Sequence, residues 1–398
     1  RKNYFYPDLP KGYQISQFEI PVVQGGEVEF FLGDEKKTVR LVRAHLEEDA
    51  GKSLHEDFIG QSGIDLNRAG TPLIEVVSEP VMHSSAEAVA YMKAVHRLVR
   101  WLGVSDGNME EGSFRCEPNL SLRPVGQAAY GTKVELKNIN SFKFVKDAVE
   151  YEIKRQTKVL SEGGKVYQET RLWNHERGET AVMRNKEEAH DYRYFPDPDL
   201  VPLEISVERI ELLRQGLPEL ASAKQARFTR DYGIPEYDAG ILTSSRALSV
   251  YFDACVKLYP HPKTVSNWVM GELLRELNHA GIEADASPVT PERLVELLTL
   301  VDQGVVSLKV ARDIFPDVYA SGKAPAQIIQ DKGLTQVSDE GSLVTIIHEV
   351  LMKHPAQVAQ FKEGKQQVLG FLVGQVMKAS GGKANPGKVN ELLKKTLG

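Results

Sequence analysis

The chain has 398 residues, of which 41% are hydrophobic and 26% are charged, and its formal net charge at pH 7 is −6. This length suits two or three domains around at least one sizeable core, and the composition is ordinary for a soluble globular protein. A net charge of −6 argues against a nucleic-acid-binding protein whose whole surface is basic. The two cysteines, Cys116 and Cys255, are too few for a disulfide framework or a Cys-rich zinc site.

The two ends of the chain carry their own signals. The segment RKNYFYPDLP holds no apolar signal sequence, and no apolar run reaches the length of a membrane span, so we expect a cytoplasmic protein. Because the first residue is not Met, we also expect that the chain begins inside a longer natural one. From position 353 to 398 there are eight lysines and two acidic residues, a local charge of +6 that leaves −12 for the rest. This basic tail is suited to bind a polyanion.

Two strong helices are predicted in the first half of the chain. Ser84 and Glu87 form a capping box that opens an amphipathic helix, and Gly103 stands where a left-handed C-cap is expected. A second helix should run over 141–162 and end at the glycine pair that follows it.

Three segments alternate between polar and apolar residues, as strands with one polar face do: 39–45, 113–123 and 132–139. The connection PVGQAAYG suits a hairpin loop between the last two. Pro118 implies an edge position or a bulge in the run that contains it. We therefore expect an antiparallel sheet with packed helices and one richly polar face.

The second half of the chain has a helical pattern, with helix starts marked by N-cap residues at Thr290, Ser338 and Asn385. The predicted fold class is α+β. An N-terminal cradle of antiparallel sheet with packed helices would span 1–217, an all-helical domain 218–332, and a small helical tail module 333–398.

No familiar nucleotide-binding loop is present. Gly51, Lys52 and Ser53 look like the end of a phosphate loop, but the position five residues before Gly51 holds Leu46 in place of the required glycine. There is no G-x-G-x-x-G either. If the protein uses ATP, it does so outside the phosphate-loop and Rossmann plans.

Acidic residues gather on the predicted polar sheet face. Three of them, Glu47, Glu48 and Asp49, follow His45 in the chain. The others are Glu110, Glu111, Glu117 and Glu135. The interleaved cations are Lys52, Arg115, Lys133 and Lys137. Carboxylates hold Mg²⁺ and cations neutralise phosphate charge, so the pattern suits a magnesium–nucleotide site. The simpler interpretation is a solvated sheet face with alternating charges, and the pattern alone favours it.

Nucleophilic catalysis has little support in the sequence. No G-x-S-x-G elbow occurs, and neither cysteine lies beside an obvious base. Cys116 falls on the apolar side of its alternating run, which favours a packed thiol over a reactive one. We expect that the chain hydrolyses no amide by itself.

Long segments of the chain resemble the B subunits of the aspartyl/glutamyl-tRNA amidotransferases, which make Asn-tRNA and Gln-tRNA indirectly. They are RKNYFYPDLPKGYQISQ, HLEEDAGKS, DLNRAGTPLIEVVSEP, GVSDGNMEEGSFRCEPN, GTKVELKNINSF, ETRLW, DYRYFPDPDL and GFLVGQVMKASGGKANP. The likeness runs nearly end to end and in register.

This resemblance implies an ATP-dependent carbon–nitrogen ligase with glutamine as amide donor. In the family, the B subunit phosphorylates the Asp or Glu side chain on misacylated tRNA with ATP and Mg²⁺, and ammonia displaces the phosphate. A glutaminase A subunit supplies the ammonia through a channel, and a small C subunit completes the complex. The expected partners are those two subunits, misacylated tRNA and the synthetase that misacylates it. By resemblance, Glu47 and Glu48 fall on metal positions, with Glu117 and Glu135 close to the site.

Two departures from the family pattern bear on these expectations. The family begins with a strand containing G-L-E-V-H, whose Glu and His join the metal site, and this chain lacks that segment. The family usually shows R-C-D-A-N, whereas this chain has Glu117 at the acidic position and Pro118 after it. Glu117 keeps the charge but extends its reach by one methylene.

Two other functions remain open on sequence grounds. The chain could be a non-catalytic scaffold that presents tRNA to a separate enzyme, or an unrelated ATP-dependent ligase acting on a small acid. The second leaves the basic tail unexplained. For tRNA binding, the predicted residues are Lys378, Lys383, Lys388, Lys394 and Lys395.

Overall fold

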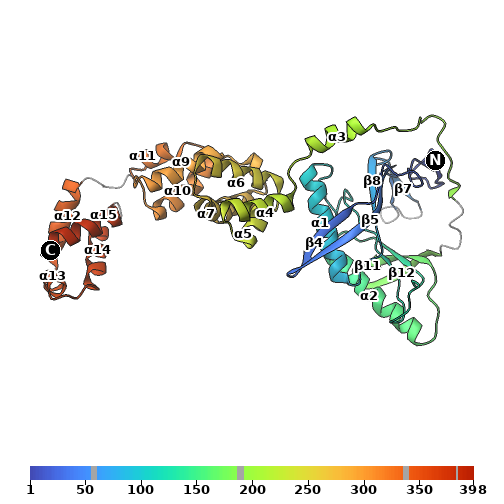
Figure 1. The fold of residues 1–398 in the computed structure, drawn as a ribbon, viewed down its shortest axis with the longest axis horizontal. Coiled ribbons are helices and arrows are strands. Elements are labelled where there is room, and N and C mark those ends of the chain that lie inside the picture. The colour runs from blue at the N-terminus through green and yellow to red at the C-terminus, as the bar shows by residue number, and fades with distance from the viewer. Residues whose placement is uncertain (55–60, 186–191, 335–339, 382–383) are drawn as a thin grey trace. The chain divides into compact units, whose positions relative to one another are not determined.

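A computed structural model describes residues 1–54, 61–185, 192–334, 340–381 and 384–398. The chain divides into two compact units, Arg1–Pro218 and Glu219–Gly398 (Figure 1). The first holds all the strands that the described residues form, and the second is helical. The predicted α+β class is therefore confirmed.

The first sheet of the N-terminal unit is built around one long strand, β5 (Glu35–Glu48). It pairs antiparallel with β3 (Val23–Gln24), β4 (Glu27–Leu32) and β8 (Pro72–Ser78). Two small antiparallel pairs lie beside it in the chain: β1 (Lys2–Asn3) with β2 (Tyr13–Gln14), and β6 (Lys52–Leu54) with β7 (Gly63–Asp65). The predicted alternating strand over 39–45 is confirmed as part of β5.

The second sheet has the order β12-β11-β10-β9. These strands are β9 (Asn119–Leu120), β10 (Val134–Lys137), β11 (Glu169–Asn174) and β12 (Glu179–Asn185). The predicted antiparallel pairing of the runs around 119 and 135 is confirmed, because Glu135 lies opposite Asn119. Two details differ from the prediction. Only two residues of 113–123 form a strand, since Pro118 has no amide hydrogen for a longer ladder, and β10 pairs parallel with β11.

Both predicted helices of this unit are confirmed. α1 (Ser85–Leu102) begins at Ser84, whose hydroxyl accepts the Glu87 amide at 3.1 Å, and ends at Gly103, whose φ is 71°. The Glu87 carboxylate accepts the amide of His83 instead of that of Ser84. α2 (Phe142–Ser161) is capped by Ser141. The two helices pack together over a core shared with β10 and β11 (Figure 1).

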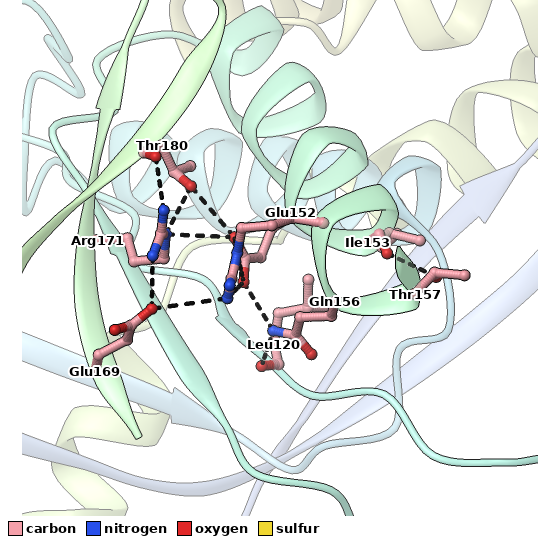
Figure 2. Close-up of polar contacts among 9 residues, drawn as sticks. Leu120, Glu152, Ile153, Gln156, Thr157, Glu169, Arg171 and Thr180 are labelled. Carbon is pink, nitrogen blue, oxygen red and sulfur yellow. Dashed lines mark hydrogen bonds and ion pairs between the residues drawn. The ribbon is translucent and has the colours of Figure 1, made fainter. Parts of the chain in front are cut away.

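A buried ionic cluster joins α2 to the second sheet (Figure 2). Glu152, which is fully buried, receives two bonds from Arg155 Nε at 3.1 and 2.9 Å and lies 3.7 Å from Arg171 of β11. Arg171 in turn donates to Glu169 at 2.6 Å and to Thr180 of β12 at 2.8 Å. One carboxylate thereby connects a helix with two strands.

The N-terminal unit ends in α3 (Val207–Gly216), which has no buried residue. The C-terminal unit contains two separate apolar clusters. The first is formed by α4 (Ala221–Tyr232), α5 (Glu236–Leu242), α6 (Arg246–Leu258), α7 (Pro262–Trp268), the π-helical turn η2 (Val269–Leu273), α8 (Leu274–Ala280), the 3₁₀ turn η3 (Ala284–Ala286), α9 (Pro291–Asp302), α10 (Leu308–Ser321) and α11 (Pro325–Asp331).

The second cluster is formed by α12 (Glu340–Lys353), α13 (Pro355–Lys362), α14 (Val368–Ala379) and α15 (Pro386–Leu397). The predicted caps at Thr290 and Asn385 are confirmed for α9 and α15, whereas Ser338 lies outside the described residues. The division of the helical half into domains 218–332 and 333–398 stays a prediction. Among the described residues, no helix is long and apolar enough to span a membrane.

Candidate active site

The pairing of β5 with β8 brings one imidazole and two carboxylates together. His45 and Glu47 are two residues apart on β5 and so face the same side, and the register places Glu75 of β8 opposite His45. His45 Nε2 lies 3.2 Å from Glu47 Oε1 and 3.3 Å from Glu75 Oε2. The three ligand atoms lie within 4.8 Å of one another, close enough to surround one ion.

The hydrogen-bond partners of His45 are one arginine and two carboxylates. Its ring is fully buried, and Arg43 Nε donates to its Nδ1 at 3.3 Å. A neutral imidazole whose Nδ1 accepts a bond carries its proton on Nε2. His45 therefore acts as a donor that bridges Glu47 and Glu75, and oxygen atoms are the ligands that this cluster offers to an ion.

The two carboxylates repel each other. Burial, followed by the charge of Glu47, raises the pKa of Glu75, and Glu117 adds to this rise, while His45 and Arg43 oppose it. A divalent cation would relieve the repulsion, and paired carboxylates are hard oxygen ligands of the kind that Mg²⁺ prefers.

Glu48 lies on the other side of β5, because neighbouring residues of a strand point to opposite faces. Its carboxylate accepts the amide of Ile15 at 2.8 Å and forms an ion pair with Lys11. Glu47 instead accepts the Ser16 hydroxyl at 2.6 Å. Glu47 and Glu48 thus lie on opposite faces of the strand, and the metal-binding role of each stays a prediction.

Glu117 and Glu135 share one lysine. Lys137 Nζ lies 2.9 Å from Glu117 Oε1 and 3.9 Å from Glu135 Oε1. The hydroxyl of Thr170, a fully buried residue of β11, donates to Glu135 Oε2 at 2.7 Å. Three of the predicted residues therefore form a group, two of them on β10 and Glu117 just before β9.

Arg115 belongs to a third group, centred on Asp49. Asp49 is buried, and its carboxylate accepts Arg115 Nη2 at 2.6 Å and Arg68 Nε at 3.0 Å. Lys52 and Lys133 are exposed, and neither makes an ion pair with the residues that the structure describes. Of the four predicted cations, Arg115 and Lys137 are thus tied to acidic residues.

Tyr194 stands beside the carboxylate cluster. Its ring stacks on Phe18 at 5.1 Å, and the Arg43 guanidinium lies over Phe18 at 4.7 Å. Burial, followed by the charge of Glu47, raises the pKa of Tyr194 to about 12. The phenol therefore stays protonated at neutral pH and is available as a hydrogen-bond donor.

The backbone around Tyr194 is held in an unusual conformation. Arg193 has a φ of 42°, in the left-handed region that non-glycine residues rarely occupy. The following residues are fastened to the start of the chain: the Phe195 amide donates to the Arg1 carbonyl at 3.1 Å, and Arg1 Nε bonds Asp197 at 2.8 Å. These contacts stabilise the turn that presents Tyr194.

Sequence reasoning missed Glu75 and Tyr194 as site residues. Glu75 interrupts the apolar run LIEVV, and an isolated acid in such a strand was the available signal. Tyr194 lies in DYRYFPDPDL and offered no signal beyond its family likeness. Cys116, by contrast, follows the expectation of an unreactive thiol, since burial raises its pKa to about 12.

The predicted tRNA-binding lysines lie on the outside of the last two helices. Lys378, Lys388, Lys394 and Lys395 are exposed, and Lys383 lies outside the described residues. The opposite side of α15 packs Val389, Leu392, Leu393 and Leu397 into the second apolar cluster. The helix therefore presents its charge away from its core.

Two family descriptions match the chain. The description "GatB/GatE catalytic domain" matches residues 1–211, and "GatB domain" matches residues 250–397. The first match covers both sheets and all three groups of site residues.

Curated relatives align with the whole chain. The protein from Geobacter sp. (strain M21) is 56% identical over 400 residues, covering 100% of this chain and 84% of that protein. The proteins from Alkalilimnicola ehrlichii and Burkholderia cenocepacia (strain HI2424) are 56% and 55% identical, with the same coverage. All three are named as B subunits of the aspartyl/glutamyl-tRNA(Asn/Gln) amidotransferase. The chain therefore belongs to the GatB family of amidotransferase B subunits, and its N-terminal unit carries that family's catalytic domain.

Proposed function

We propose that this chain activates the side-chain carboxylate of Asp or Glu on misacylated tRNA with ATP, and that the activated group is then amidated. The observation that carries the proposal is the cluster of His45, Glu47 and Glu75, with Arg115 held by Asp49, two residues beyond Glu47 in the chain. A ligase of this kind must hold a polyphosphate and a carboxylate against each other, and fixed cations with a metal ion do so.

The reaction has two steps that balance without an acyl-transfer nucleophile in this chain. A side-chain carboxylate oxygen attacks the γ-phosphorus of ATP, ADP leaves, and an acyl phosphate forms. Ammonia then attacks the acyl carbon, inorganic phosphate leaves, and the amide remains. Glu47 and Glu75 would hold Mg²⁺, which when bound would supply positive charge to neutralise the phosphates. The protonated phenol of Tyr194 would donate to an oxygen of the reacting groups.

The proposed partners follow from the same assignment. Ammonia would come from a glutaminase A subunit, with a small C subunit in the complex, and the misacylating synthetase would deliver the tRNA in the cytoplasm. The exposed lysines of α14 and α15 would contact the tRNA backbone. Glu135, which accepts the Thr170 hydroxyl, and Lys137 would contribute to the same charged surface as Glu117.

The experiment uses the assembled complex and compares Glu47→Gln, Glu75→Gln and Glu48→Gln. The first two should lower tRNA-dependent amidation at least about a hundredfold and raise the Mg²⁺ concentration required, while glutamine hydrolysis persists. Glu48→Gln should leave the Mg²⁺ requirement unchanged, because Glu48 bonds Ile15 and Lys11 on the other face. Glu29→Gln on β4, an exposed carboxylate of the same sheet, is the matched control.

A second measurement separates an enzyme from a scaffold. Labelled γ-phosphate should pass from ATP to misacylated tRNA in the absence of glutamine, and Glu75→Gln should prevent the transfer. If the wild-type complex transfers no phosphate under these conditions, the chain presents tRNA without activating it.

A further inference from the structure

Asp49 holds two guanidinium groups next to each other. Its side chain is buried, and its two oxygens bond different arginines, Oδ1 to Arg115 at 2.6 Å and Oδ2 to Arg68 at 3.0 Å. The backbone of Asp49 is fixed as well, because its amide donates to the Thr71 carbonyl at 2.8 Å and its carbonyl accepts the Gly70 amide at 2.9 Å. The carboxylate is therefore a rigid anchor for both cations.

The two arginines are held differently. The other two nitrogens of the Arg68 guanidinium donate to backbone carbonyls: Nη1 to Glu111 at 3.4 Å and Nη2 to Gly112 at 3.3 Å. Arg115 bonds only Asp49 within the described part of the chain, and 48% of its side chain is exposed. Arg115 thus keeps Nε and Nη1 available to a ligand, while Arg68 ties Asp49 to the loop that precedes Arg115.

This group follows the carboxylate cluster closely along the chain. His45, Glu47 and Asp49 alternate along β5 and its continuation, so that Asp49 follows Glu47 by about 7 Å of extended chain. Arg115 precedes Glu117 by two residues, and Glu117 forms an ion pair with Lys137 of β10 at 2.9 Å. Two residues beyond Glu47, the chain thus carries the carboxylate that holds Arg115.

The charges of the Asp49 group sum to +1, with Arg115 on its accessible side. A guanidinium with free nitrogens binds phosphate through two parallel hydrogen bonds, and Arg115 has such nitrogens on its accessible side. We propose that Arg115 binds a phosphate group of ATP, and that Asp49 and Arg68 are positioning residues that hold it there. This inference rests on the proposed function.

ATP fits this arrangement better than the tRNA backbone does. The polyphosphate of ATP carries several negative charges in a row. It can reach from a cation held by Glu47 and Glu75 to the Arg115 guanidinium, which Asp49 holds two residues after Glu47. A phosphodiester carries one charge, so it needs only one of the two groups. Phosphate chemistry is common to both ligands, and the experiment distinguishes them.

The experiment measures the ATP dissociation constant of the assembled complex by equilibrium dialysis, and KM for ATP and for misacylated tRNA separately. Arg115→Gln should weaken ATP binding about ten- to a hundredfold and leave KM for tRNA unchanged. Arg115→Lys keeps the charge but lacks the planar fork and should fall between Arg115→Gln and wild type. Arg177→Gln, which removes an exposed arginine from the turn between β11 and β12, should change neither constant.

Asp49 and Arg68 are tested by a different readout. Asp49→Asn keeps both cations but removes the anchor, so it should lower kcat more than it weakens ATP binding. Arg68→Gln should reproduce that split. Because Asp49 is buried, the melting temperature of each variant is measured alongside, and the exposed Arg115 supplies the decisive variant if Asp49→Asn does not fold.

Two outcomes would overturn the inference. One is an ATP dissociation constant in Arg115→Gln equal to that of Arg177→Gln. The other is a raised KM for tRNA with ATP binding unchanged, which would assign Arg115 to the tRNA phosphates. ATP binding that depends on Arg115 in a wild-type complex that transfers no phosphate would contradict the proposed function and leave this inference standing.

Discussion

The buried carboxylate of Glu152 offers a sharp test of how the catalytic unit is held together. Glu152 lies behind the second sheet and bonds Arg155, Gln156 and Thr180, with Arg171 at 3.7 Å (Figure 2). Glu152→Gln preserves the size of the side chain but replaces a charged oxygen with an amide nitrogen. That nitrogen would meet donors on every side, so the change isolates the charge without opening a cavity.

The expected cost follows from the exposure of the partners. Removing one member of a buried ion pair costs about 3–5 kcal/mol when the other stays buried. Arg155 and Arg171 retain 21% and 11% side-chain exposure, which lets water compensate them in part. We therefore expect the low end, about 3 kcal/mol. For a unit of this size that corresponds to a melting-temperature loss of about 6–12 °C.

Amide hydrogen exchange measures this effect locally, without interference from the helical unit. Peptides from α2 and β11 should lose protection by about a hundredfold in Glu152→Gln, since each 1.4 kcal/mol is about a factor of ten. The matched control is Glu179→Gln, which breaks the exposed pair with Arg177 at 3.4 Å in the same unit. That pair should contribute about 0–1 kcal/mol.

Equal protection in Glu152→Gln and Glu179→Gln would refute the reasoning. It would mean that the neighbouring Glu169, 2.6 Å from Arg171, compensates both arginines without Glu152. A loss confined to α2, with β11 unaffected, would show that Glu152 stabilises its own helix and does not connect it to the sheet.

Three further predictions concern single residues or segments. Thr170→Val should lower kcat for amidation about tenfold with the melting temperature nearly unchanged, because Glu135 loses its 2.7 Å donor, and Thr170→Ser should restore the rate. Deleting residues from 333 onward should weaken tRNA binding about tenfold or more and flatten its salt dependence while sparing ATP binding; unchanged affinity and slope in a filter-binding titration would remove the tail lysines from the interface. A thiol reagent at pH 8 should leave Cys116 and Cys255 unmodified until the chain unfolds, because burial raises the pKa of each to about 12, and rapid native labelling would contradict this.

Local signals predicted much of the fold. The caps at Ser84 and Gly103 are read from neighbouring residues, and the structure uses the same side chain and the same left-handed glycine. The alternation of 39–45 likewise predicted a strand, and β5 continues it so that His45 and Glu47 meet on one face. Each of these features depends on residues within a few positions of one another, which a sequence displays directly.

The site was less accessible to the same reasoning because it depends on pairing between distant strands. Glu75 reaches His45 only through the register of β8 on β5, which no local pattern reveals. The period-two rule of a strand sends Glu48 to the face opposite Glu47, where it bonds Ile15, and its metal role stays a prediction. The run 113–123 alternates like a strand, yet only two of its residues find a partner.

The exposed helix α3 has a consequence for the susceptibility of the chain to proteases. It is 10 residues long, buries none of them, and is stabilised by the Ser206 cap and the ion pair between Arg214 and Glu211. Isolated helices shorter than about 12 residues are marginally stable in water. We therefore expect α3 to unfold locally and often, in spite of these two contacts. Limited digestion of the free chain should therefore cut first within Val207–Gly216, after Arg209 or Arg214 with trypsin, and release the catalytic domain from the helical half.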